Sequence, residues 1–214
     1  AYSYTVTDAN GCTSSVTGAI TQPSGLSATA TQGSILCNGG TTTVNVTATG
    51  GTAPYSGTGI FTVSAGSYSL VVIDANGCST NACGSISQPT TLTANSTHGN
   101  IFCGGTTTVN VTATGGTSPY NGTGIYTVSA GAYSYTVIDA NGCTSSVSGT
   151  ITQPSGLSAS ATQGTILCNG GTTTVNVTAT GGTSPYSGTG TFTIGTKTYS
   201  YTVTDANGCK SIVC

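Results

Sequence analysis

The sequence predicts an all-β protein made of tandem small immunoglobulin-like or fibronectin-like β-sandwich repeats of about 66 residues. The stretch Asp-Ala-Asn-Gly-Cys occurs four times, ending at Cys12, Cys78, Cys143 and Cys209, so its spacing is nearly constant. Thr, Ser, Val, Tyr and Gly dominate, Met is absent, and no window shows the apolar period of a helix. Short strand-like runs with turn signals about 8 to 12 residues apart favour sandwiches over a β-solenoid, whose coils usually repeat after about 20 to 30 residues.

Gln-Pro pairs ending at Pro23, Pro89 and Pro154 set the repeat boundaries. Residues 1–23 are then the C-terminal part of a repeat, 24–89 and 90–154 are complete repeats, and 155–214 lacks the end of its final strand. Because both ends fall inside a repeat, we expect the chain to be a segment of a longer periodic molecule, with self-pairing of incomplete ends as a rarer alternative.

Within the repeat 24–89, alternation predicts strands over residues 26–36, 41–49, 59–63, 68–74 and 79–88. Val44 and Val46 belong to the inward face of the second strand. Pro54 fixes the backbone before Tyr55, which we expect to be a core aromatic. In the next repeat, Tyr133, Tyr135 and Val137 share one strand face.

Each Asp-Ala-Asn-Gly-Cys stretch follows a strand and is predicted to be a type I′ hairpin turn, capped by its Asp. The turn residues are Asp8, Asn10, Asp74, Asn76, Asp139, Asn141, Asp205 and Asn207. These four Asp residues are the only acidic ones in the chain. Calcium requires several carboxylates, whereas each repeat offers one, so the sequence predicts neither a metal site nor a cofactor.

Nine cysteines at periodic positions predict disulfides and an oxidising compartment. The spacing favours pairs within each repeat, and such loops of about 40 residues each stabilise a small domain by about 4 kcal/mol. These pairs are Cys37–Cys78, Cys103–Cys143 and Cys168–Cys209. The rival pairing joins successive repeats as Cys12–Cys37, Cys78–Cys103 and Cys143–Cys168. Cys83 and Cys214 are extra, and with Cys12 they are candidates for cross-links between repeats or subunits; buried free thiols are the alternative for the extra pair.

The charge of the chain excludes several classes of partner. Lys197 and Lys210 are the only Lys or Arg residues, and His98 is the only histidine. Such a surface cannot bind phosphates, so nucleic acid is excluded as a partner, and no apolar run is long enough to insert into a membrane. No catalytic constellation surrounds His98, so the sequence predicts that the protein is not an enzyme.

Three runs in one repeat resemble a known family: Gly-Gly-Thr-Ser-Pro-Tyr at 115–120, Ala-Gly-Ala-Tyr-Ser-Tyr-Thr-Val-Ile-Asp-Ala-Asn-Gly-Cys at 130–143, and Ile-Thr-Gln-Pro at 151–154. They look like the SprB-type repeat of large Bacteroidota cell-surface adhesins, found in gliding-motility and type IX secreted proteins. The likeness extends over all repeats, although the Trp common after the Pro-Tyr segment is replaced by Gly-Thr-Gly. It implies an extracellular, non-enzymatic tandem β-sandwich stalk or adhesive filament.

From these observations we expect a structural or adhesive segment of an extracellular bacterial surface filament or stalk that associates with itself. The alternative is a module that binds carbohydrate or a host surface through Tyr-bearing loops. Its candidate ligand residues are Tyr55, Tyr120 and Tyr186.

Overall fold

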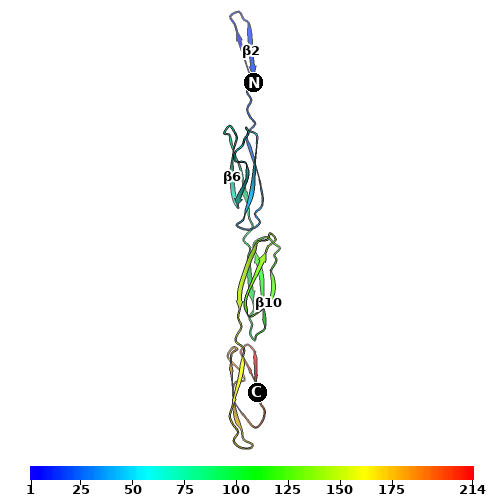
Figure 1. Ribbon diagram of the computed structural model, residues 1–214, viewed down its shortest axis with the longest axis vertical. Helices are drawn as coiled ribbons and strands as arrows, with labels where there is room; N and C mark the ends of the chain where they lie inside the picture. The colour runs from blue at the N-terminus through cyan, green and yellow to red at the C-terminus, as the bar shows by residue number, and fades with distance from the viewer. The chain divides into compact units, whose positions relative to one another are not determined.

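The computed structural model describes all 214 residues, and every regular element in it is a β-strand. Figure 1 shows strands joined by turns throughout the chain. The chain divides into two compact units, Ala1–Thr90 and Thr91–Cys214. The all-β fold class is therefore confirmed, and each unit is described by itself.

The first unit contains a hairpin followed by one sandwich domain. Strands β1 (Tyr2–Thr7) and β2 (Thr13–Gly18) form the antiparallel hairpin. The domain has a three-stranded sheet of β3 (Ser27–Gln32), β4 (Thr41–Thr49) and β5 (Gly59–Ser64), and a two-stranded sheet of β6 (Gly66–Ile73) and β7 (Ser79–Ile86).

The second unit contains two such domains. The first has one sheet of β8 (Thr93–His98), β9 (Thr106–Thr114) and β10 (Gly124–Ser129), and another of β11 (Gly131–Ile138) and β12 (Thr144–Ile151). The second has β13 (Ser158–Gln163), β14 (Thr173–Thr180) and β15 (Gly190–Ile194), with β16 (Tyr201–Thr204) and β17 (Lys210–Val213) as the smaller sheet.

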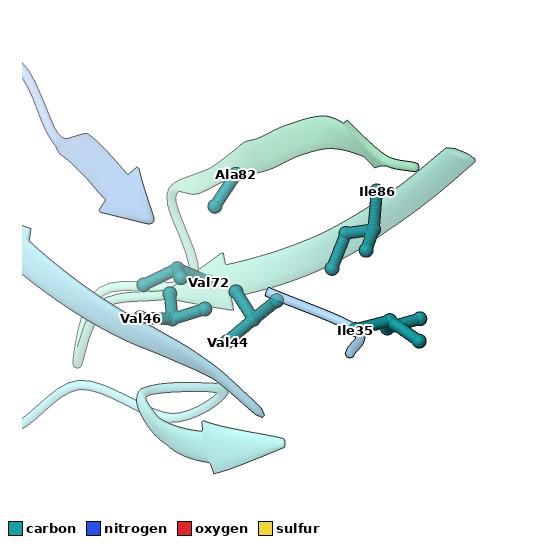
Figure 2. Close-up of a cluster of buried hydrophobic side chains, with 6 residues drawn as sticks. All are labelled: Ile35, Val44, Val46, Val72, Ala82 and Ile86. Carbon is teal, nitrogen blue, oxygen red and sulfur yellow. The ribbon is translucent and has the colours of Figure 1, made fainter. Parts of the chain in front are cut away.

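The core of each domain lies between its two sheets. In the domain 24–89, Val44 and Val46 of β4 meet Val72 of β6 and Ala82 of β7, as Figure 2 shows. Burial alternates along β4, so the predicted inward face is confirmed. The predicted strand 41–49 agrees with the structure, whereas the strand predicted over 26–36 ends at Gln32, because the chain then turns away into the loop that carries Cys37.

The hairpin Tyr2–Gly18 is the isolated counterpart of β11 and β12. Its register pairs Tyr4 with Val16, as the register of the complete domain pairs Tyr135 with Val147. Without a facing three-stranded sheet its apolar side chains stay in solvent: Val6 is 71% exposed. Every hydrogen bond of residues 1–18 is made within the hairpin itself.

Candidate functional site

The repeated Asp organises one end of each domain. Oδ1 of Asp139 accepts the N–H groups of Asn141 and Cys143, both at 2.9 Å, which closes the hairpin turn. Its Oδ2 accepts the N–H of Thr117 at 2.9 Å from the Gly-Gly-Thr turn after β9. The expectation of a capping Asp is confirmed, and the bond to Thr117 adds a link between the two sheets.

The turn is of a different type from the one predicted. A type I′ turn needs positive φ at both central residues, but no non-glycine residue of the chain has positive φ. Only Gly142 does, at 84°, and its N–H bonds to the carbonyl of Asp139 at 3.0 Å. The type I′ prediction is therefore wrong, and the geometry is a type I turn followed by a left-handed glycine, a common three-residue hairpin loop.

The three interior Asp residues, Asp74, Asp139 and Asp205, are buried without a cationic partner. The hydrogen bond from the backbone of Thr52 is the leading cause that lowers the pKa of Asp74. For Asp139, burial pushes the pKa upward, but backbone hydrogen bonds from Thr117 and Cys143 outweigh it and the pKa lies below its ordinary value. The pKa of Asp205 is lowered by the same balance. These carboxylates are therefore ionised at neutral pH and stabilised by peptide dipoles.

Space at this turn is reserved by a glycine. Gly116 has φ of 60°, and a Cβ built there would lie 2.7 Å from Oδ2 of Asp139. A side chain at this position would thus disturb both the backbone and the carboxylate. The sequence offered a signal for this contact, because Gly-Gly-Thr recurs at 50–52, 115–117 and 181–183, but it was read only as a turn.

The three candidate ligand tyrosines, Tyr55, Tyr120 and Tyr186, pack against the cores of their domains. Each hydroxyl donates a 2.6 Å hydrogen bond to the carbonyl of the glycine five residues earlier, Gly50, Gly115 or Gly181. They close the turn between the sheets, as a core aromatic was expected to do. Their hydroxyls are used inside the domain, which counts against the alternative in which these loops bind a ligand.

The two cysteines of one repeat lie at opposite ends of its domain. The Cys37 loop lies against the departing linker, because Asn38 donates to the carbonyl of Pro89 and the N–H of Gly39 donates to Gln88. The Cys78 turn instead lies at the entering linker and lines a groove with Pro23. The nine residues of β4 separate these ends by about 30 Å, whereas a disulfide needs Cα atoms within about 7 Å.

The observed disulfide therefore joins different domains. Cys103, in the loop after β8, is bonded to Cys209, in the turn before β17, with a Cα–Cα distance of 5.2 Å and a sequence separation of 106. Both predicted pairings of Cys103, with Cys143 and with Cys78, are wrong. The physical reason is that the far end of one domain faces the turn end of the next, where Phe102, Cys103 and Gly104 line one groove with Pro154 and Cys209.

The other cysteines divide into bonded and free. Cys37 and Cys143 are also disulfide-bonded. The free thiols are Cys12, Cys78, Cys83, Cys168 and Cys214, all of them exposed. The expectation that Cys78 and Cys168 form bonds within their repeats is thus wrong, and so are the rival pairings of Cys12 with Cys37 and of Cys143 with Cys168. Because Cys83 and Cys214 are exposed, they are not the buried thiols of the alternative reading, and their cross-linking stays a prediction.

Other chemistry is sparse. His98 is exposed, with its Nδ1 at 3.0 Å from the carbonyl oxygen of Gly99 and its ring edge-on to Tyr133. No three His, Cys, Asp or Glu side chains gather closely enough to hold a metal ion. No helical segment has the length and apolarity that crossing a bilayer requires.

Comparison with known proteins gives one structural likeness. No protein-family model matches the chain, and no curated protein matches it. Among solved structures, it is similar to the three N-terminal domains of the bacteriophage RB49 highly immunogenic outer capsid protein (Hoc). The identity is 13% and the TM-score 0.35, with 89% of this chain and 80% of that chain covered.

Proposed function

We infer that this chain is a structural and adhesive segment of an extracellular bacterial surface filament or stalk, and that it associates with itself. The observation that carries the proposal is the bond between Cys103 and Cys209, which joins successive domains rather than bracing a single one. A covalent link at a domain junction suits a molecule that transmits tension. Disulfides persist in oxidising surroundings, which supports a location outside the cytoplasm.

The distribution of charge supports self-association. Of the four carboxylate side chains, only that of Asp8 is exposed, because Asp74, Asp139 and Asp205 are buried. Two Lys side chains are the only other side chains that are charged at every physiological pH. Repulsion between like charges, which keeps many proteins apart in solution, is therefore weak between copies of this chain.

The proposal is structural rather than catalytic. The buried carboxylates hold turns, the repeated tyrosines close the sandwich, and His98 lies on the surface. Each conspicuous polar group of the repeat thus has a partner within its own domain.

Negative-stain electron microscopy and sedimentation of the oxidised protein test the proposal. We expect lateral or head-to-tail assemblies that become longer as the protein concentration rises. Dispersed monomers under native conditions at all concentrations would contradict it. Protease treatment of intact source cells tests the location: the protein should be cleaved without lysis.

A further inference from the structure

A groove at the turn end of the domain 24–89, which we call the Cys78 groove, matches the occupied groove at Cys209. Seven residues of the Cys78 groove recur at the equivalent positions of the Cys209 groove, with a constant shift in number. They are Gln22, Pro23, Ser24, Gly25, Leu26, Gly51 and Cys78, which correspond to Gln153, Pro154, Ser155, Gly156, Leu157, Gly182 and Cys209.

The two grooves differ in what lies in them. The Cys209 groove also contains Phe102, Cys103 and Gly104 from the loop after β8, and a disulfide closes it. The Cys78 groove has no such loop among its lining residues, and Cys78 is an exposed free thiol. The Cys78 groove is therefore the same surface without its occupant.

A loop suited to that groove is exposed elsewhere in the chain. We call residues 165–171, which follow β13, the Cys168 loop. Cys168 is an exposed free thiol. The neighbouring Leu167 is 90% exposed, whereas Phe102, which precedes the bonded Cys103, is 53% exposed, and Leu36, which precedes the bonded Cys37, is 55% exposed. The loop before Cys168 thus lacks the cover that its bonded counterparts have.

The Cys168 loop already has the conformation of a bonded loop. The N–H of Gly171 donates to the carbonyl of Cys168 at 3.0 Å, as the N–H of Gly40 donates to that of Cys37. Docking would therefore require little reordering of its backbone, which lowers the entropic cost of binding.

We propose that the Cys78 groove binds the Cys168 loop of a second copy of this chain, and that a disulfide between Cys168 and Cys78 closes the joint head to tail. This inference rests on the proposed self-association and assigns its contact. The hairpin Tyr2–Gly18 leaves room, because it makes no hydrogen bond to the domain that carries the groove.

The chemistry of the joint is a two-electron oxidation. The thiols of Cys168 and Cys78 each lose one proton and one electron, and a sulfur–sulfur bond forms. A small disulfide oxidant accepts both electrons and both protons; glutathione disulfide, for example, is reduced to two molecules of glutathione. A matching loop seated in the groove raises the effective concentration of one thiol at the other, so this pair should form ahead of pairs between other exposed cysteines.

A pair of complementary variants tests the joint on the full-length chain. Cys78→Ser retains only the loop thiol, and Cys168→Ser retains only the groove thiol. Each is incubated with glutathione disulfide, alone and mixed, and is then run on non-reducing gels. We expect a ladder of covalent multimers from the unsubstituted protein, no ladder from either variant alone, and a covalent dimer, with nothing larger, from the mixture. The dimer also shows that both variants fold.

The remaining free thiols provide matched controls. Cys12→Ser, Cys83→Ser and Cys214→Ser should each leave the ladder unchanged, and mass spectrometry of unreduced peptides should identify Cys78 bonded to Cys168. A ladder that persists in Cys78→Ser or Cys168→Ser, cross-links mapped to Cys83 or Cys214 instead, or no multimer at all would overturn the inference.

The double variant Cys78→Ser/Cys168→Ser separates this inference from the proposed function. The inference predicts that its assemblies, seen by negative stain, dissociate on dilution, whereas oxidised assemblies of the unsubstituted protein persist. Equal persistence of both would refute the joint while leaving self-association intact. If neither protein assembles at any concentration, the proposed function fails together with the joint.

Discussion

The disulfide between Cys103 and Cys209 should make the second unit nearly inextensible under tension. When the ends of this unit are pulled, the force enters at Cys103, crosses the sulfur–sulfur bond and leaves at Cys209. The strands enclosed between these residues therefore carry no load. Removing the bond places that part of the chain under force.

The magnitude follows from the sequence separation of 106 residues. A fully extended chain spans about 3.3 to 3.6 Å per residue, so these residues add about 350 to 380 Å of extension. In the oxidised protein the same interval is held at a Cα–Cα distance of 5.2 Å.

Single-molecule force spectroscopy measures this difference. One handle is attached at the exposed Thr90, in the linker before the second unit, and the other at the C-terminus. We expect Cys103→Ser/Cys209→Ser to extend further than the oxidised protein by the length given above, and a reductant to produce the same gain in the unsubstituted protein. Cys168→Ser, which removes a free thiol, should behave as the oxidised protein does. Full extension of the oxidised protein, or equal extension of the double variant, would refute the reasoning.

Three further predictions concern the domains themselves. Val137→Ala removes two methyl groups from a fully buried site and should lower the free energy of unfolding, measured with urea, by about 2 to 3 kcal/mol. Val6→Ala, at the equivalent but exposed hairpin position, should change it by no more than about 0.5 kcal/mol, and similar costs at both sites would contradict the assigned core. Tyr120→Phe leaves the carbonyl of Gly115 without its donor and should cost about 1 to 3 kcal/mol in the same assay; an unchanged urea midpoint would argue against that role. Because the native pKa of Asp139 lies below its ordinary value of 3.8, its stabilisation is present above that value and is lost as the pH falls through it. Urea midpoints between about pH 2 and 6 should therefore drop less in acid for Asp139→Asn, and a titration identical to that of the unsubstituted protein would count against the buried carboxylate.

Local pattern was enough to predict the strands and the faces of the sheets. Alternating apolar and polar residues depend on the period of an extended chain, so the strand over 41–49 and the inward set with Val44 and Val46 could be read directly. The turn residues were found because Asp and Gly act within a few residues of themselves. The type of turn was missed because Asn-Gly suits two hairpin geometries, and the backbone adopted the one that spares Asn141 a positive φ.

The disulfide connectivity and the role of the ends of each domain were decided only by the tertiary structure. Sequence spacing measures distance along the chain, whereas a disulfide requires proximity in space, and β4 holds Cys37 and Cys78 at opposite ends of one domain. The sequence by itself therefore determined a tandem β protein rich in cysteine. The packing of one domain's end against the next determined which sulfur atoms could meet, because rigid strands transmit position over a length that no local pattern encodes.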